Sequence, residues 1–148
     1  MNNENIKKIV EDLIATFLYA GQVALDLRDK GLKKKMKSDN TPVSNGDIKV
    51  NEILTTKIKT LTPNLPIISE ESSENKDKKN LNDFWLIDPI DGTYDYINNL
   101  DEFTLNAGLI LDNQPAGGLI FAPAKKRMFY SYGLNNAYEV VGENKVKL

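Results

Sequence analysis

The sequence predicts an α+β fold in which two N-terminal helices pack on one face of a mainly antiparallel sheet. Two observations carry this prediction. Apolar residues recur at steps of three and four through the first 61 residues, whereas the residues after Pro66 fall into short segments with the period of strands. Helices followed by a run of strands favour this arrangement over the alternating order of a doubly wound fold. We expect residues 1–148 to form a single domain.

The first element is a long amphipathic helix, whose apolar positions lie three or four residues apart and so share one face. Gly31 is expected to end it, and the lysines that follow are expected to form a solvated loop rather than a phosphate-binding patch. The helix positions are Ile6, Ile9, Val10, Leu13, Ile14, Phe17, Gly21, Ala24 and Leu25, and the loop lysines are Lys33, Lys34, Lys35 and Lys37.

A second helix is predicted to begin at Ser44. Residues 44–47 resemble a capping box, in which Ser44 caps free backbone amides and Asp47 lies near the positive end of the helix dipole. Apolar residues continue along one face to Leu61, and Pro63 then breaks the helix. Taken alone, Asp47 would be only a helix cap.

Short strand-like segments follow the second helix. A polar loop at 71–82, which we expect to be mobile, separates the first two of them. Residues 145–148 begin one more alternating segment, so we expect the chain to stop where a neighbouring unit would begin. The strand segments are 67–68, 84–87, 103–111, 115–121, 127–132 and 137–141.

The composition limits the kinds of site and function that this chain can have. A net charge of -2 and a pI near 5.2 disfavour a nucleic-acid binder, which normally carries a clear cationic excess. The chain has no cysteine and no histidine, which excludes thiolate or imidazole metal sites and histidine-based catalysis. No apolar run approaches the ~20 residues of a membrane span, and a cytoplasmic protein is expected.

Acidic residues follow two neighbouring predicted strands. Glu70 comes directly after one, and Asp88 and Asp91 come after the other. Adjacent strands would bring these three anionic groups within a few ångströms, where they repel each other unless a divalent cation neutralises them. Magnesium fits this oxygen-ligand set best, and Ile90 could offer its backbone carbonyl as a further ligand.

The turn after the second of these strands could also bind phosphate. Pro89 restrains the backbone between the two aspartates, and Gly92 lets the backbone approach a ligand closely. If Gly92 and Thr93 open a short helix through Ile97, its free amides point toward the same place. The alternative is an ordinary strand-to-turn connection, because Asp, Pro and Gly are common turn residues and adjacent acids are usually solvated.

At these positions the sequence resembles the inositol monophosphatase superfamily, whose hallmark is an acidic pair after one strand and a DP(I/L)DGT turn after the next. Residues 85–93, WLIDPIDGT, match that turn. The likeness is closest to the bacterial 3'(2'),5'-bisphosphate nucleotidase branch. It rests on KSDNTPVS at 37–44, LTP at 61–63, PIISEE at 66–71, EFTLN at 102–106 and AP at 122–123.

The resemblance implies a magnesium-dependent, lithium-sensitive phosphatase that removes the 3'-phosphate of adenosine 3',5'-bisphosphate, with inositol phosphate as the alternative substrate. Residue by residue, it implies that Glu70, Asp88, Asp91 and the carbonyl of Ile90 ligate the metal ions. Thr93, paired with Asp47, would position and deprotonate the attacking water, with Glu70 as a further catalytic carboxylate. The backbone amides of Gly92 and Thr93 would hold the phosphate.

The superfamily has a second, α/β domain with a Trp-Asp motif that completes one metal site, and this sequence contains no match to it. Three hypotheses follow: a phosphatase that is active alone, a half-enzyme that needs a separately encoded C-terminal domain, and a remnant that binds metal or a partner without turnover. The half-enzyme hypothesis predicts an exposed apolar face, with a homo-oligomer as an alternative cover. The expected partners are therefore a small phosphorylated substrate and a protein that covers the apolar face, either a separately encoded C-terminal domain or a second copy of this chain.

Overall fold

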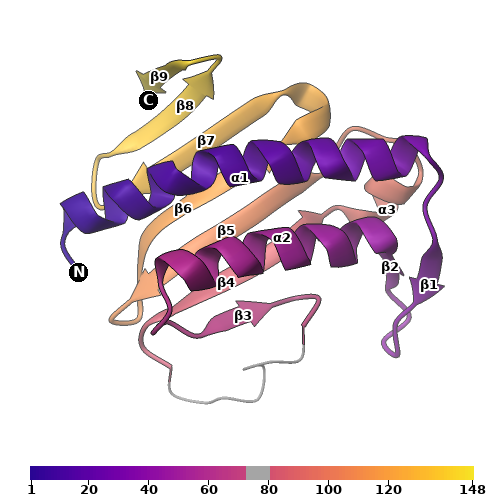
Figure 1. Cartoon of the computed structure of the whole chain (residues 1–148), viewed down its shortest axis with the longest axis horizontal. Coiled ribbons are helices and arrows are strands. Elements are labelled where there is room, and N and C mark those ends of the chain that lie inside the picture. Colours follow the sequence, from indigo (N-terminus) through magenta and orange to yellow (C-terminus); the bar gives the residue numbers. More distant parts are fainter. Residues whose placement is uncertain (73–80) are drawn as a thin grey trace.

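A computed structural model describes residues 1–72 and 81–148 and confirms the α+β prediction (Figure 1). Residues 73–80, most of the expected polar loop, lie outside the described residues. The helices are α1 (Asn3–Asp29), α2 (Asn45–Leu61) and α3 (Thr93–Ile97), with a 3-10 turn at Pro123–Lys125. The strands are β1 (Lys34–Met36), β2 (Pro42–Ser44), β3 (Ile67–Ser69), β4 (Phe84–Asp91), β5 (Thr104–Leu111), β6 (Gln114–Ala122), β7 (Arg127–Tyr132), β8 (Ala137–Val141) and β9 (Asn144–Lys147).

Both long helices begin at side-chain caps. Asn2 caps α1, and Ser44 caps α2 through the predicted capping box with Asp47. The first helix ends one residue before Lys30, and Gly31 follows with φ +93°, the left-handed backbone that favours glycine. The predicted end of the first helix and both predicted ends of the second are therefore confirmed to within a residue or two.

Seven strands form one sheet in the order β3-β4-β5-β6-β7-β8-β9. The strands from β4 onward pair antiparallel with their neighbours in chain order, and those from β5 onward are the predicted meander. Among the described strands of this sheet, only β3 and β4 pair parallel. The expected segment at 145–148 is realised as β9, paired with β8.

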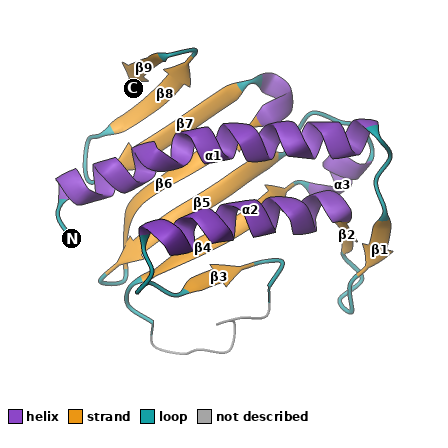
Figure 2. Ribbon diagram, viewed as in Figure 1, coloured by secondary structure: helices purple, strands orange, loops and turns teal. Residues whose placement is uncertain are grey.

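One face of the sheet carries the core. The helices α1 and α2 lie side by side across that face (Figure 2) and bury their apolar stripes against β4, β6 and β7. Trp85 is fully buried there, and its indole nitrogen donates to the hydroxyl of Thr62 at 3.0 Å. Gly21 of α1 lies so close to the ring of Phe121 that no side chain would fit between them. Helix and sheet thus approach as closely as their backbones allow.

The opposite face of the sheet is uncovered in the described part of the chain. Alternate residues of β4 point to opposite faces, so Leu86 and Asp88 share the open face while Trp85 and Ile87 face the helices. Leu86 is 51% exposed and Ile120, on β6, is 50% exposed. The exposed apolar face that the half-enzyme hypothesis predicts is therefore present.

The lysine segment after α1 differs from the prediction. Residues Lys34–Met36 form β1, which pairs antiparallel with β2 as a separate two-stranded ribbon instead of a loop. The three β1 side chains are exposed and show no apolar alternation, so the local sequence carries no strand signal. Across the described residues, no helix is long and apolar enough to cross a membrane.

Candidate functional site

The parallel pair of strands sets the position of the acidic residues. In its register, Ser69 at the end of β3 lies opposite Ile87 of β4, and the amide of Glu70 donates to the carbonyl of Ile87 at 3.1 Å. Parallel strands bring their carboxyl ends to one edge of a sheet, so Glu70 emerges beside Asp88. This is the neighbourhood that the sequence predicted for the two residues.

A bulge in β4 separates Asp88 from Asp91. Asp88 lies opposite Asn106 and Asp91 lies opposite Thr104, so three steps on β4 face two steps on β5. The extra residue changes the direction of the side chains that follow it, as bulges next to functional sites commonly do. Asp88 is half-buried and Asp91 is exposed at the end of the strand.

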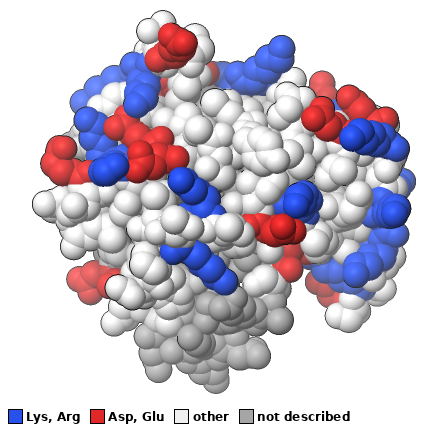
Figure 3. Space-filling model, in the orientation of Figure 1, with Lys and Arg blue, Asp and Glu red and all other residues white. Residues whose placement is uncertain are grey.

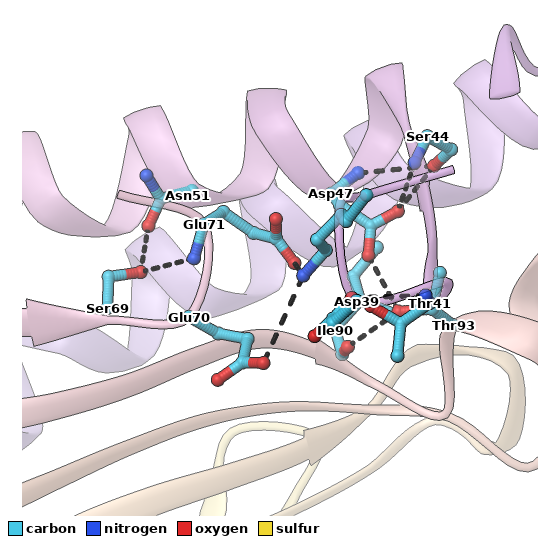
Figure 4. Close-up of polar contacts among 11 residues, drawn as sticks. Asp39, Thr41, Ser44, Asp47, Asn51, Ser69, Glu70, Glu71, Ile90 and Thr93 are labelled. Carbon is cyan, nitrogen blue, oxygen red and sulfur yellow. Dashed lines mark hydrogen bonds and ion pairs between the residues drawn. The ribbon is translucent and has the colours of Figure 1, made fainter. Parts of the chain in front are cut away.

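Asp47 is the fully buried carboxylate of the site (Figure 4). Its Oδ2 accepts from the backbone amide of Ser44 at 2.9 Å and from the Ser44 hydroxyl at 2.6 Å. Its Oδ1 accepts from the hydroxyl of Thr93 at 2.8 Å. The contact between Asp47 and Thr93 that the resemblance implied is therefore present, and it joins α2 to α3.

Thr93 is held at the first turn of α3 by the backbone before it. Gly92 has φ +89° and ψ +41°, and a Cβ there would lie 2.6 Å from the carbonyl oxygen of Glu102. Only glycine fits this left-handed, crowded position. The Thr93 hydroxyl oxygen also lies 3.2 Å from the carbonyl oxygen of Ile90. The Thr93 side chain thus reaches back across the turn to the end of β4.

The carboxylates are close enough to affect each other's ionisation. Burial, together with repulsion from Asp91, Glu70, Glu71 and Asp47, raises the pKa of Asp88 to about 6. Even so, within residues 1–72 and 81–148 no three acidic side chains converge tightly enough to form a ready-made metal cage. That Glu70, Asp88 and Asp91 together ligate a metal ion stays a prediction.

The predicted site residues therefore fall into two groups around one edge of the fold. Thr93 contacts Asp47 and lies against Ile90, which brings the predicted catalytic pair together with one predicted carbonyl ligand. Asp88 is in the electrostatic field of Asp91 and Glu70. The Inositol monophosphatase family profile matches residues 4–142, which include all of these positions.

The chain belongs to the inositol monophosphatase family.

Two kinds of known protein resemble this family member. It is 35% identical over 133 residues to the 3'(2'),5'-bisphosphate nucleotidase CysQ of Aggregatibacter actinomycetemcomitans, a match that covers 88% of this chain and 49% of the relative. The fold is similar to that of a staphylococcal inositol monophosphatase-1 soaked in LiCl, with TM-score 0.78, 17% identity and coverage of 94% and 52% of the two chains. It is also similar to an IMPase/NADP phosphatase solved with Mg2+ and phosphate, with TM-score 0.74, 19% identity and coverage of 88% and 50%. The chain spans about half the length of the curated relative it matches.

The sequence analysis did not predict an ion pair between Lys37 and Glu71 beside the candidate site. The ammonium of Lys37, at the end of the lysine segment, lies 3.1 Å from a carboxylate oxygen of Glu71 and 3.9 Å from one of Glu70. Burial alone would lower the pKa of Lys37, but the hydrogen bond and charge of Glu71 raise it above its ordinary value. Burial raises the pKa of Glu71, whose side chain is 5% exposed. Position 37 lies in the KSDNTPVS match, which was the one signal that set it apart from the other lysines.

Proposed function

We propose that this chain provides the metal- and phosphate-binding half of a magnesium-dependent phosphatase that hydrolyses a small phosphate monoester. The observation that carries the proposal is the hydrogen bond between the part-buried Thr93 and the buried Asp47, beside the acidic edge of β3 and β4. Burying a carboxylate close to several further carboxylates lowers the stability of the fold. Such an arrangement therefore indicates a functional role and not a structural one alone. Family membership supports the same chemistry.

The donor set fits a hard divalent cation. Glu70, Asp88 and Asp91 offer carboxylate oxygens and Ile90 offers a carbonyl oxygen, which are the ligands that Mg2+ prefers. The pKa of Asp88 is raised first by burial and then by repulsion from neighbouring carboxylates, and a bound cation would favour the charged form against both effects. A cation bound there would neutralise charge on the phosphate and lower the pKa of the attacking water.

The remaining steps belong to the side chains of this chain. Because the Thr93 hydroxyl donates its proton to Asp47, its oxygen lone pairs are available to accept a hydrogen bond from a water. As the water attacks phosphorus, its proton can pass to the Thr93 oxygen while the Thr93 proton passes to Asp47. The bond between phosphorus and the ester oxygen breaks in the same step, and the leaving oxygen takes a proton from solvent water to give the alcohol. The amides of Gly92 and Thr93 would hold the phosphate, and Glu70 would help to orient the water.

The proposed substrate is adenosine 3',5'-bisphosphate, which would lose its 3'-phosphate. The 35% identity to a bisphosphate nucleotidase and the motifs of that branch support this choice over an inositol phosphate. One fold neighbour was solved with Mg2+ and phosphate, and another was solved as an inhibitory complex soaked in LiCl. Lithium sensitivity is accordingly part of the proposal.

The open face of the sheet enters the proposal because Asp88 lies on it. Asp88, Asn106 and Ile120 form one row across β4, β5 and β6, so the half-exposed apolar surface runs directly to the site. We propose that a cover over this face, either a separately encoded C-terminal domain or a second copy, completes the substrate pocket. The third hypothesis, a remnant that binds metal without turnover, differs only in lacking that cover.

Phosphate release from adenosine 3',5'-bisphosphate with Mg2+ tests the activity, with inositol 1-phosphate alongside and lithium as the inhibitor. The Asp88→Asn variant should lose turnover with little change in fold, while Glu143→Gln, an exposed carboxylate in the turn between β8 and β9, should keep it. Unchanged release in Asp88→Asn would contradict the site assignment.

A second measurement keeps the proposal testable when the chain alone is inactive. Mg2+ should raise the urea midpoint of the wild-type chain, because a ligand that binds only the folded state stabilises it by about 1.4 kcal/mol at tenfold excess over Kd. Asp88→Asn should lose this stabilisation. Absence of both turnover and Mg2+-dependent stabilisation would overturn the proposed function.

A further inference from the structure

A cavity lies away from the candidate site, on the outer surface of the helix layer. It has a volume of about 640 Å³, within the range of small-molecule pockets. Its walls are the C-terminal half of α1, the first two turns of α2, and the segment that enters β1. None of the residues given a chemical role in the proposed phosphatase lines it.

The floor of this cavity is apolar and its rim is cationic. Tyr19, Val23 and Leu27 of α1 face Ile48 of α2 across it. Tyr19 is 60% exposed and Ile48 is 45% exposed, although both are large apolar side chains that folding normally covers. The charged side chains of the lining are Lys33, Lys34, Lys35, Lys49 and Glu52.

Three of these lysines have no competing partner among the described residues. The side chain of Glu52 pairs with Lys49, with 3.3 Å between ammonium and carboxylate, so these two charges largely offset each other. Within residues 1–72 and 81–148, no hydrogen bond or ion pair is made by the side chains of Lys33, Lys34 and Lys35. Figure 3 shows basic residues gathered at the right-hand edge of this face, where Figure 1 places β1.

We propose that this cavity binds an amphipathic anion: a small molecule with an aromatic or aliphatic body and one anionic head group. The body would cover the exposed rings and branched side chains of the floor, which releases water from apolar surface. The head group would lie at the end of the cavity formed by Lys34 and Lys35, where the net charge is positive. A neutral apolar molecule leaves the lysines unused, and a bare inorganic anion leaves the floor uncovered.

The floor also touches the cap of α2. Ser44 and Asn45 line the cavity, and Asn45 is fixed to the lysine segment through its side chain, which accepts from the Lys33 amide at 2.9 Å. The backbone amide of Asn45 donates to the Lys33 carbonyl at 3.0 Å. This double link holds the rim lysines against the start of α2, so the cavity is a formed feature of the fold and not a gap between loose segments.

The test uses 1-anilinonaphthalene-8-sulfonate as the probe, with the neutral N-phenyl-1-naphthylamine and inorganic sulfate as comparisons. Calorimetric titration should show binding of the anionic probe at least about tenfold tighter than that of the neutral one, which corresponds to one well-placed ionic contact. Sulfate alone should bind more weakly still. Equal affinity for the two aromatic probes, or no binding of the anionic probe up to about 1 mM, a free energy near 4 kcal/mol, would overturn the proposal.

Matched variants locate the site. Lys34→Gln with Lys35→Gln should weaken the anionic probe about tenfold, whereas Lys7→Gln with Lys8→Gln, an adjacent lysine pair on α1 outside the cavity, should leave it unchanged.

The apolar floor has its own control. Ile48→Gln should weaken both aromatic probes, whereas Ile120→Gln on the open sheet face, at nearly the same exposure, should weaken neither. Because both isoleucines are half exposed, neither change is expected to unfold the chain. A probe that responds to Ile120→Gln and not to Ile48→Gln binds the sheet face, and that result would overturn the proposal.

Discussion

Removing the hydroxyl of Thr93 should destabilise the fold by leaving one oxygen of a buried carboxylate without its donor. Asp47 is fully buried, and its Oδ1 accepts from Thr93 at 2.8 Å while Oδ2 is occupied by two bonds from Ser44. Hydrogen bonds to charged groups contribute about 1.5–3 kcal/mol. Thr93→Ala also removes a methyl group, so the informative quantity is the difference between Thr93→Ala and Thr93→Ser.

We expect Thr93→Ser to be more stable than Thr93→Ala by about 1.5–3 kcal/mol, because serine restores the donor without the methyl group. The assay is urea unfolding without divalent cations, with comparable slopes for the two variants. Thr55 provides the matched comparison, since its hydroxyl donates to the neutral carbonyl of Asn51 at 2.7 Å in the middle of α2. There, serine and alanine should differ by less than about 1 kcal/mol.

The result that would refute this reasoning is a difference of less than about 0.5 kcal/mol between Thr93→Ser and Thr93→Ala. It would mean that the contact between Thr93 and Asp47 contributes nothing to the folded state. The role of Thr93 as a water-positioning group would then lose its structural basis as well, because an unheld hydroxyl is not oriented.

Two further predictions concern the backbone turn and an ion pair far from the site. Gly92→Ala should lower stability by about 1–2 kcal/mol because alanine disfavours the left-handed backbone, and by a further amount because the new Cβ must displace the Glu102 carbonyl. Gly142 has φ +62° and open space around it, so Gly142→Ala should lower stability only through the backbone conformation. Equal urea midpoints for the two variants would contradict this reasoning. Burial alone would raise the pKa of Glu11, but Lys145 and a tyrosine hydroxyl lower it below its ordinary value of 4.5 in the folded protein. The ionised Glu11 therefore stabilises the fold fully above about pH 4.5, and this stabilisation is lost as the pH falls through the lowered pKa of the folded state. Glu11→Gln should therefore lose less stability than wild type between about pH 6 and pH 3, and parallel pH profiles would disprove the assignment.

Features that depend on neighbouring residues were predictable from the sequence. The capping box of Ser44 and Asp47 spans four residues, and its two reciprocal bonds form as predicted. The strands from β4 onward follow from local alternation and turn residues. The acidic edge was predictable as well, because it needs only the rule that adjacent strands bring their ends together.

Features that depend on distant residues were not predictable from pattern alone. Asp47 and Thr93 are 46 residues apart, and only the family resemblance suggested their contact. The ion pair of Lys37 and Glu71 joins two segments that both look solvated, and burial of those side chains is decided by the tertiary fold. The raised pKa of Asp88 likewise depends on distant residues, because it reflects burial by the tertiary fold and repulsion from carboxylates on other segments.

The two carboxylate oxygens of Asp47 accept hydrogen bonds from different segments, and this has a consequence for how the site forms. One oxygen completes the cap of α2 and the other holds Thr93, so the event that starts a helix also fixes the direction in which the carboxylate points. Orientation of the proposed water-activating pair is thus achieved during folding and requires no rearrangement when substrate arrives. A substitution at position 47 cannot change the chemistry of the pair without also changing the nucleation of the helix, which ties the evolution of this site to the stability of α2.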